Sequence, residues 1–259
     1  MKSFINEEFL LTTEAARRLY HGCAEDMPVI DYHCHLSPAD IYADKRFADI
    51  GEAWLADDHY KWRVMRANAV PEEYVSGKAS FREKFMRFAA VMPGLIGNPI
   101  YHWSHLELKR YFGFGELLDA STAQAAWDCA NAKLQSPAGS ARSLISAFNI
   151  RALCTTDDPA DDLRWHKLLA ADESFETKVL PTFRPDKALG VDSPDFPAYA
   201  AKLAEAAGAP IRTADDMKAA LEKRIEYFAA AGCRLSDHAF AAPDFTVWDE
   251  KAAEAAIRK

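Results

Sequence analysis

The chain has 259 residues, of which 49% are hydrophobic and 27% charged, a composition typical of a globular protein with a sizeable core. Its net charge is −8, because 39 acidic residues outnumber 31 lysines and arginines. A negative chain repels phosphate backbones and anionic membranes, so we expect neither a nucleic-acid nor a membrane partner. Five scattered cysteines without a C-x-x-C pair, and an N-terminus with glutamates in place of an apolar leader, predict a cytoplasmic protein.

A helix and a strand are the first elements expected along the chain. The spacing of apolar residues predicts a helix at 13–23, and the run at 28–35, bounded by prolines, predicts a strand. From 38 to 148 the pattern is helical, with turn signals between the helices. The clearest helical patterns there cover residues 79–91, 103–112 and 122–134.

Strands alternate with helices in the rest of the chain. Residues 150–156 predict a buried strand, and Asp157, Asp158 and Pro159 after it predict a helix start with a carboxylate cap. Further strands are expected at 178–183 and 233–238. Further helices are expected at 196–207, at 213–232 with an apolar stripe of Met217, Leu221, Ile225 and Phe228, and at 249–259.

This alternation predicts an α/β fold with a parallel sheet. A complete (β/α)8 TIM barrel takes about 250 residues, so the length permits one, but the pattern yields only about four strands. Two architectures therefore stay open: a smaller open α/β fold, and the first half of a longer barrel protein.

His33 and His35 stand two residues apart on the strand expected at 28–35. Residues at this spacing on a strand share one face, so the two imidazoles can bind one divalent ion, with a third ligand from another strand end. The alternative is one packed and one exposed histidine on an edge strand.

A second cluster of reactive side chains occupies residues 57–63 and includes His59 and Tyr60. Its structural alternative is a solvated helix start, capped by Asp57 or Asp58 and anchored by a packed Trp62.

Arg184, Asp237 and His238 lie at the ends of expected strands. Arg184 can bind a carboxylate or phosphate through two parallel hydrogen bonds, with a surface salt bridge as the alternative. Asp237 and His238 can act as acid/base groups or as ligands. His102 and His105 are expected in a packed interior because their neighbours are aromatic.

Four motifs, taken together and in this order, resemble uronate isomerases (glucuronate isomerases) along essentially the whole chain. They are DYHCHL at 31–36, DHYKWRVMR at 58–66, NPIYHW at 98–103 and TTDDP at 155–159. The resemblance implies an amidohydrolase-superfamily protein with a (β/α)8 TIM-barrel fold, of which this chain would hold about the first four strands. The implied segments are 1–37 with the N-terminal helix and strand 1, 38–148 as a large helical insertion, and 149–259 as β/α units of an incomplete barrel.

The resemblance also implies the isomerisation of D-glucuronate to D-fructuronate, or of D-galacturonate to D-tagaturonate, through an enediol. Under this hypothesis His33 and His35 bind a divalent metal, expected to be zinc. His59 and Tyr60 would hydrogen-bond the open-chain sugar near the reacting carbons. Arg184 and Asp237 match strand-end positions of the family, as a substrate-binding and a catalytic candidate.

Two other hypotheses compete with this one. A metal-dependent hydrolase of the same superfamily would use its ion to activate water. A truncated half-barrel would be inactive, because it exposes two sheet edges and half a core. For the partners we expect a small-molecule uronate sugar and a homo-oligomer.

Overall fold

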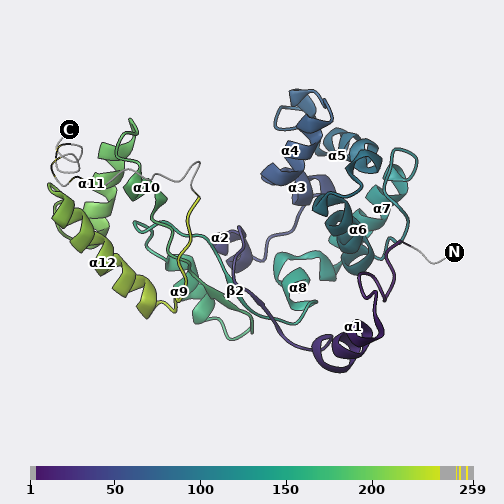
Figure 1. The fold of residues 1–259 in the computed structure, drawn as a ribbon, viewed down its shortest axis with the longest axis horizontal. Coiled ribbons are helices and arrows are strands. Elements are labelled where there is room, and N and C mark those ends of the chain that lie inside the picture. Colours follow the sequence, from purple (N-terminus) through teal and green to yellow (C-terminus); the bar gives the residue numbers. More distant parts are fainter. Residues whose placement is uncertain (1–3, 240–248, 250, 252–254, 256–259) are drawn as a thin grey trace. The chain divides into compact units, whose positions relative to one another are not determined.

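The computed structural model describes residues 4–239 together with residues 249, 251 and 255. The chain forms two compact units (Figure 1). Unit 1 comprises Met1–Met27 and Asp44–Phe148, and unit 2 comprises Pro28–Ala43 and Asn149–Lys259. The units cut across the segments expected from the sequence, because the N-terminal helix groups with the helical block. The helix expected at 249–259 falls mostly on residues outside the described part.

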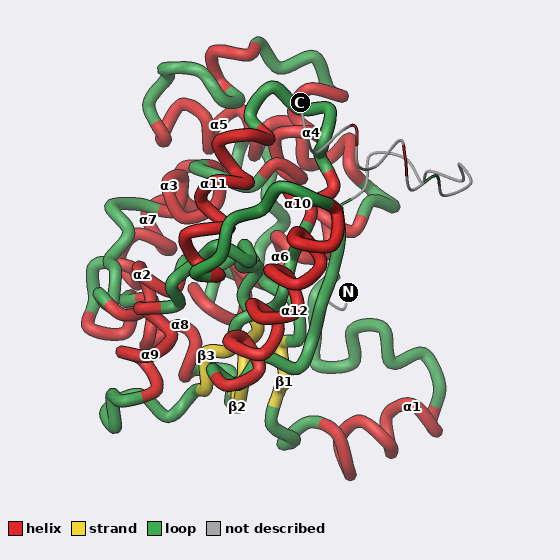
Figure 2. Tube along the Cα trace, turned by 90° about the vertical axis from the view of Figure 1, so that its left-hand side faces the viewer, coloured by secondary structure: helices red, strands yellow, loops and turns green. Residues whose placement is uncertain are grey.

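Unit 2 is built on three parallel strands that lie side by side in the order β1, β2, β3 (Figure 2). The strands are β1 (Val29–Asp31), β2 (Ile150–Cys154) and β3 (Lys178–Leu180). Ile30 lies beside Ala152 on the next strand, and Leu153 lies beside Val179. This sheet and its helices confirm the predicted α/β class.

Backbone hydrogen bonds continue beyond the regular strands and hold the following residues in line. The donors and acceptors are Cys34 N to Cys154 O (2.9 Å), Asp157 N to Thr182 O (3.0 Å), Phe183 N to Leu235 O (3.1 Å) and Asp237 N to Phe183 O (3.3 Å). The residues that follow all three strands, and residues 235–237, therefore meet at one edge of the sheet, where parallel strands end.

The expected strands were too long. The strand expected at 28–35 ends at Asp31, and the one expected at 178–183 ends at Leu180. Residues 233–238 contribute only an isolated parallel bridge between Ser236 and Phe183. Apolar runs mark where a strand can lie, whereas its length is set by the partner that supplies the hydrogen bonds.

The helices of unit 2 follow the strands along the chain. They are α2 (Pro38–Tyr42), α9 (Arg164–Ala170), α10 (Asp186–Leu189), α11 (Phe196–Ala207) and α12 (Ala214–Ala230). The helix expected at 196–207 is confirmed with those bounds. Thr213 caps α12, since its hydroxyl accepts from Asp216 N and the Asp216 carboxylate accepts from Thr213 N in return.

The apolar stripe expected on α12 was partly wrong. Met217 and Phe228 are buried, but Ile225 is 50% exposed. Arg224 occupies a buried position beside it and donates to the main-chain oxygens of Pro159 (2.7 Å) and Asp161 (2.6 Å). The loop before α9 is thereby fastened to α12 by a cation that is satisfied by carbonyl groups.

Unit 1 consists of helices joined by short turns. Its α-helices are α1 (Glu14–Leu19), α3 (Ile50–Leu55), α4 (His59–Ala67), α5 (Phe81–Val91), α6 (Pro99–Phe112), α7 (Ala123–Leu134) and α8 (Ala141–Ser146). A π-helical turn Tyr20–Ala24 extends α1, and single 3-10 turns cover Glu72–Tyr74, Met92–Leu95 and Pro137–Gly139. The helices predicted at 13–23, 79–91, 103–112 and 122–134 are confirmed.

An aromatic cluster forms the centre of unit 1. Phe85 and Phe88 of α5 are fully buried, and the Trp54 ring of α3 packs edge-on against Phe88 at 5.9 Å between centroids. Burying each such side chain stabilises the fold by about 1.5–3 kcal/mol. Within the described part of the chain, every helix is too short or too polar to cross a bilayer.

His105 is a polar group inside this core, as the sequence predicted. Its Nε2 accepts a hydrogen bond from Leu118 N at 2.9 Å, so Nδ1 carries the proton and donates to Tyr101 O at 2.6 Å. Burial lowers the pKa of His105 below its ordinary value. The native state thus requires the neutral imidazole.

We therefore expect unit 1 to lose stability in mild acid. The unfolded imidazole binds a proton at about pH 6.5 and the folded one only at lower pH, so the free energy of unfolding falls as pH drops below about 6.5. In His105→Gln, the loss measured by urea denaturation between about pH 7.5 and about pH 5.5 should be smaller than in the wild type. The neighbouring buried variant Ser104→Ala should keep the wild-type loss, and an unchanged loss in His105→Gln would contradict this assignment.

Candidate active site

His33 and His35 lie just beyond the end of β1, not on a regular strand face as expected. Their rings are nevertheless adjacent, with centroids 5.0 Å apart and planes nearly perpendicular at 89°. The hydrogen bond from Cys34 N to Cys154 O keeps this stretch aligned with β2. Burial raises the pKa of the Cys34 thiol to about 12, so the residue between the two imidazoles stays protonated at neutral pH.

The side chains of Arg184 and Asp237, two separate candidates in the sequence, form a bidentate pair. Arg184 donates from Nε to Asp237 Oδ1 at 3.1 Å and from Nη2 to Oδ2 at 2.8 Å. Asp237 Oδ2 also lies 3.1 Å from His33 Nδ1. The Arg184 and Asp237 side chains are each 24% exposed, so water competes only partly for these hydrogen bonds.

Asp186 extends this cluster on the far side of Arg184. Its Oδ2 lies 3.9 Å from Arg184 Nε, and its Oδ1 lies 2.8 Å from His238 Nδ1. Asp186 also accepts from Ala239 N at 2.8 Å. Acidic and basic side chains thus alternate along the strand ends, from His33 through Asp237, Arg184 and Asp186 to His238.

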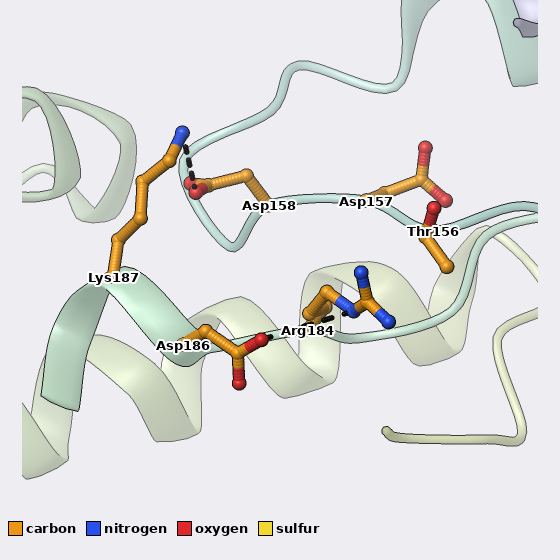
Figure 3. Close-up of a pocket in the computed structure, with 6 residues that line it drawn as sticks. All are labelled: Thr156, Asp157, Asp158, Arg184, Asp186 and Lys187. Atoms are coloured by element: carbon orange, nitrogen blue, oxygen red, sulfur yellow. Dashed lines mark ion pairs between the residues drawn. The ribbon is translucent and has the colours of Figure 1, made fainter. Parts of the chain in front are cut away.

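A pocket of about 260 Å³ opens beside this cluster (Figure 3). It is lined by Thr156, Asp157, Asp158, Arg184, Asp186 and Lys187. Lys187 Nζ pairs with Asp158 Oδ2 at 3.3 Å across the pocket, and Thr156 Oγ1 lies 3.3 Å from His35 Nδ1. The pocket therefore offers hydroxyl, carboxylate and cationic groups to a polar ligand.

The expected helix cap at Asp157 and Asp158 was wrong. Helix α9 begins at Arg164, and residues 157–163 form an irregular loop that ends in the left-handed conformation of Leu163 (φ 53°). The buried Asp157 carboxylate accepts from the hydroxyl of Thr155 at 2.7 Å, and that hydroxyl lies 2.8 Å from His166 Nε2. His166 lies in α9, and the irregular loop before that helix brings its ring back to Thr155 and Asp157.

His59 and Tyr60 belong to unit 1, where they form the first residues of α4. Asp58 caps this helix and accepts from Tyr60 N (2.9 Å), Lys61 N (3.1 Å) and Lys61 Nζ (2.8 Å). Burial raises the pKa of Asp58, but the Lys61 ammonium and these hydrogen bonds outweigh it and leave the pKa below its ordinary value. The predicted helix start with an aspartate cap is confirmed, and Trp62 Nε1 anchors it by donating to Leu55 O.

A metal centre built on the two strand-end imidazoles would be incomplete within the described part of the chain. Among the described residues, no three histidine, cysteine, aspartate or glutamate side chains come together as metal ligands. A divalent ion needs at least a third protein ligand, so His33 and His35 fit such an ion only in combination with a further group.

Taken together, the fold and the site define a class of protein. A parallel α/β sheet that gathers histidine, arginine and carboxylate side chains beyond its strand ends has the arrangement with which α/β enzymes bind small polar ligands. A model of one family of such proteins, described as glucuronate isomerase, matches residues 1–259. The chain belongs to the glucuronate isomerase family.

Named relatives agree with this assignment. A uronate isomerase of Caldanaerobacter subterraneus is 51% identical over 239 residues, which cover 92% of this chain and 51% of the relative. One from Bacillus subtilis is 48% identical over 258 residues, covering 100% and 54%. The crystal structure of a uronate isomerase from Thermotoga maritima superposes with a TM-score of 0.89 at 37% identity, covering 99% of this chain and 57% of that chain. The chain spans about half the length of the curated relatives it matches.

We expect the Arg184–Asp237 pair to contribute measurably to stability. In a double-mutant cycle with Arg184→Met and Asp237→Asn, the coupling in the free energy of unfolding should be about 1–2 kcal/mol, because the pair is partly buried and makes two charge-assisted hydrogen bonds. The exposed pair of Lys218 and Asp215 provides the control cycle and should couple by less than about 0.5 kcal/mol. Equal couplings in the two cycles would show that the bidentate geometry is not maintained in solution.

Proposed function

We propose that the protein isomerises a hexuronate between its aldose and ketose forms, D-glucuronate to D-fructuronate and D-galacturonate to D-tagaturonate. The observation that carries this proposal is the strand-end cluster of His33, Arg184 and Asp237, joined by contacts of 2.8 to 3.1 Å, in a chain of the glucuronate isomerase family. The same chain also carries His59 and Tyr60, two further candidate residues.

Isomerisation moves one proton from C2 to C1 and leaves the composition of the sugar unchanged. A base takes the C2 proton, the C2–H electron pair forms the enediol double bond, and the carbonyl oxygen at C1 gains a proton. The C2 hydroxyl then releases its proton as the C2 carbonyl forms, and C1 receives a proton on carbon. Such a site needs a proton acceptor, a donor to the developing oxyanion and a cation for the sugar carboxylate.

The candidate residues match these needs. Asp237 is the acid/base group of unit 2, held by two hydrogen bonds from Arg184. The Arg184 guanidinium has further N–H groups besides the two that donate to Asp237, and these would bind the substrate carboxylate. In unit 1 the proposed roles are a neutral hydrogen bond to the oxyanion from Tyr60, which is 50% exposed, and a hydrogen bond to the sugar from His59.

A divalent metal, with zinc as our expectation, is part of this proposal. His33 and His35 would hold it through their imidazole nitrogens, and its third ligand would come from a group outside the described cluster. When bound, the ion would polarise a carbonyl or hydroxyl oxygen of the sugar.

The larger architecture proposed is a (β/α)8 TIM barrel that begins with β1, β2 and β3. Parallel sheets are normally covered on both faces, yet Ile30 at the centre of β1 is 65% exposed. The β1 strand is also at the edge of the three-stranded sheet. Both observations support a larger sheet in which β1 gains a further neighbour. All five cysteines lie within the described part of the chain and none forms a disulfide, which supports a reducing compartment such as the cytoplasm. The homo-oligomer stays a prediction.

We expect metal content to depend on both histidines. Elemental analysis of the His33→Ala, His35→Ala double variant should show the bound divalent ion falling well below the wild-type stoichiometry, because the variant lacks both imidazole ligands. The exposed His21→Ala variant is the control and should retain the wild-type metal content. Unchanged stoichiometry in the double variant would remove the metal from the proposal.

We expect the protein to convert D-glucuronate to D-fructuronate, with the proton followed by NMR in D₂O. In Tyr60→Phe the ring is kept and the donor lost, so kcat and kcat/KM should fall together by about 10²–10³-fold at unchanged metal content. Arg18→Lys, a surface change in unit 1, is the control and should leave both constants unchanged. Hydrolysis of an amide or ester without uronate turnover would instead favour a metal-dependent hydrolase, and a folded protein inactive in both assays would favour an inactive half-barrel.

A further inference from the structure

Four polar residues of unit 2 are buried close together, and one of them, Asp157, lines the pocket. Their exposed fractions are Thr155 1%, Asp157 6%, His166 4% and Thr182 2%. A buried polar cluster is costly unless its hydrogen bonds are made, so the arrangement of these bonds shows what the cluster holds in place.

The number of available protons determines which groups in the cluster donate hydrogen bonds and which accept them. The Thr155 hydroxyl has one proton and lies 2.7 Å from Asp157 Oδ2 and 2.8 Å from His166 Nε2. Because the carboxylate can only accept, Thr155 donates to Asp157, and His166 donates to Thr155 from a protonated Nε2. The hydrogen bonds therefore run from His166 through Thr155 to the Asp157 carboxylate.

Asp157 connects this relay to the strand end that carries Arg184. Its Oδ2 accepts from Thr182 N at 3.2 Å, its main-chain N–H donates to Thr182 O at 3.0 Å, and its main-chain oxygen accepts from Arg184 N at 3.0 Å. The regular strand β3 ends at Leu180, and Pro181 has no N–H to donate. Three hydrogen bonds with Asp157, one through its carboxylate and two through its main chain, thus hold residues 182–184 where the regular strand has already ended.

Residues 182–184 in turn hold residues 235–237 in place. Phe183 N donates to Leu235 O at 3.1 Å, and Asp237 N donates to Phe183 O at 3.3 Å. The main chains that carry Arg184 and Asp237 are therefore both placed by the segment that Asp157 fixes.

We propose that Asp157 is a positioning residue, which sets the Arg184 guanidinium against Asp237 by fixing residues 182–184, with His166 and Thr155 orienting its carboxylate. His166 matters because the Thr155 hydroxyl has a second acceptor, Leu180 O at 3.3 Å, to which it can turn when nothing donates to it. The effect on turnover rests on the proposed isomerase function, whereas the effect on the geometry of Arg184 does not.

The test uses an NMR signal of the Arg184 side chain, whose Nε–H donates to Asp237 in the folded protein. In ¹⁵N-labelled protein its cross-peak is assigned as the one that disappears in Arg184→Lys. In Asp157→Ala this cross-peak should shift or broaden toward those of solvent-exposed arginines. Asp157→Asn, which keeps an oxygen acceptor for Thr155 and Thr182, should restore it in large part. Asp162→Ala is the matched control, an exposed aspartate in the same loop, and should leave the cross-peak unchanged.

Turnover of D-glucuronate is the second readout. We expect kcat/KM to fall by about 10²-fold in Asp157→Ala, the scale of a misplaced reacting group, and by less than about tenfold in Asp157→Asn. If Asp157→Ala does not fold, Thr155→Val removes the orienting hydroxyl instead and is measured in the same way. His166→Phe should move the Arg184 cross-peak in the same direction as Asp157→Ala or Thr155→Val does.

A folded Asp157→Ala or Thr155→Val protein with the wild-type Arg184 cross-peak would overturn the proposal, whatever its turnover. A shifted cross-peak in a protein whose wild type does not turn over the uronate would support the positioning role and count against the proposed isomerase activity. The two failures are thereby distinguishable.

Discussion

The continuation of the parallel hydrogen-bond ladder beyond its regular strands is the constraint on which the site of unit 2 depends. The three strands are short, yet main-chain bonds join residues 34, 157, 183 and 237 to their neighbours after the strands end. Each strand on its own would leave its polar residues on an irregular loop. Joined in this way, those residues meet at one sheet edge at fixed spacing, which is where α/β proteins build ligand sites.

Charge alternation follows from this spacing. Asp237 is contacted by both His33 and Arg184, and Asp186 lies between Arg184 and His238. Each carboxylate therefore has basic neighbours on two sides, and each contact restrains the next, as in other hydrogen-bonded networks. A ligand entering the pocket would meet side chains that are already oriented, so less ordering would remain to be done on binding.

The sequence predicted best the elements whose signals are local. Cap residues and apolar periodicity located α11 within its observed bounds and α12 to within a turn. The strands were predicted too long because the strands that pair with them are distant along the chain. Asp157 was misassigned for the same reason: an aspartate before Asp158-Pro159 has the local pattern of a helix cap, and only the fold brings Thr182 and His166 to it. Arg184 and Asp237 were identified as separate candidates, and the sequence did not predict their pairing because 53 positions separate them.

The start of α4 confirms the structural interpretation of its motif and leaves room for the proposed functional one. Asp58 meets the capping needs of the helix and binds the buried Lys61 ammonium, which also lies 5.1 Å from the Trp54 ring. The backbone at His59 and Tyr60 is thereby fixed by side chains other than their own. The two rings contact each other at 4.4 Å between centroids with planes tilted by 32°, and Tyr60 keeps half of its surface exposed. A helix start whose own side chains are not used for capping is a suitable support for the role proposed for His59 and Tyr60, because a site is most precise on a fixed backbone.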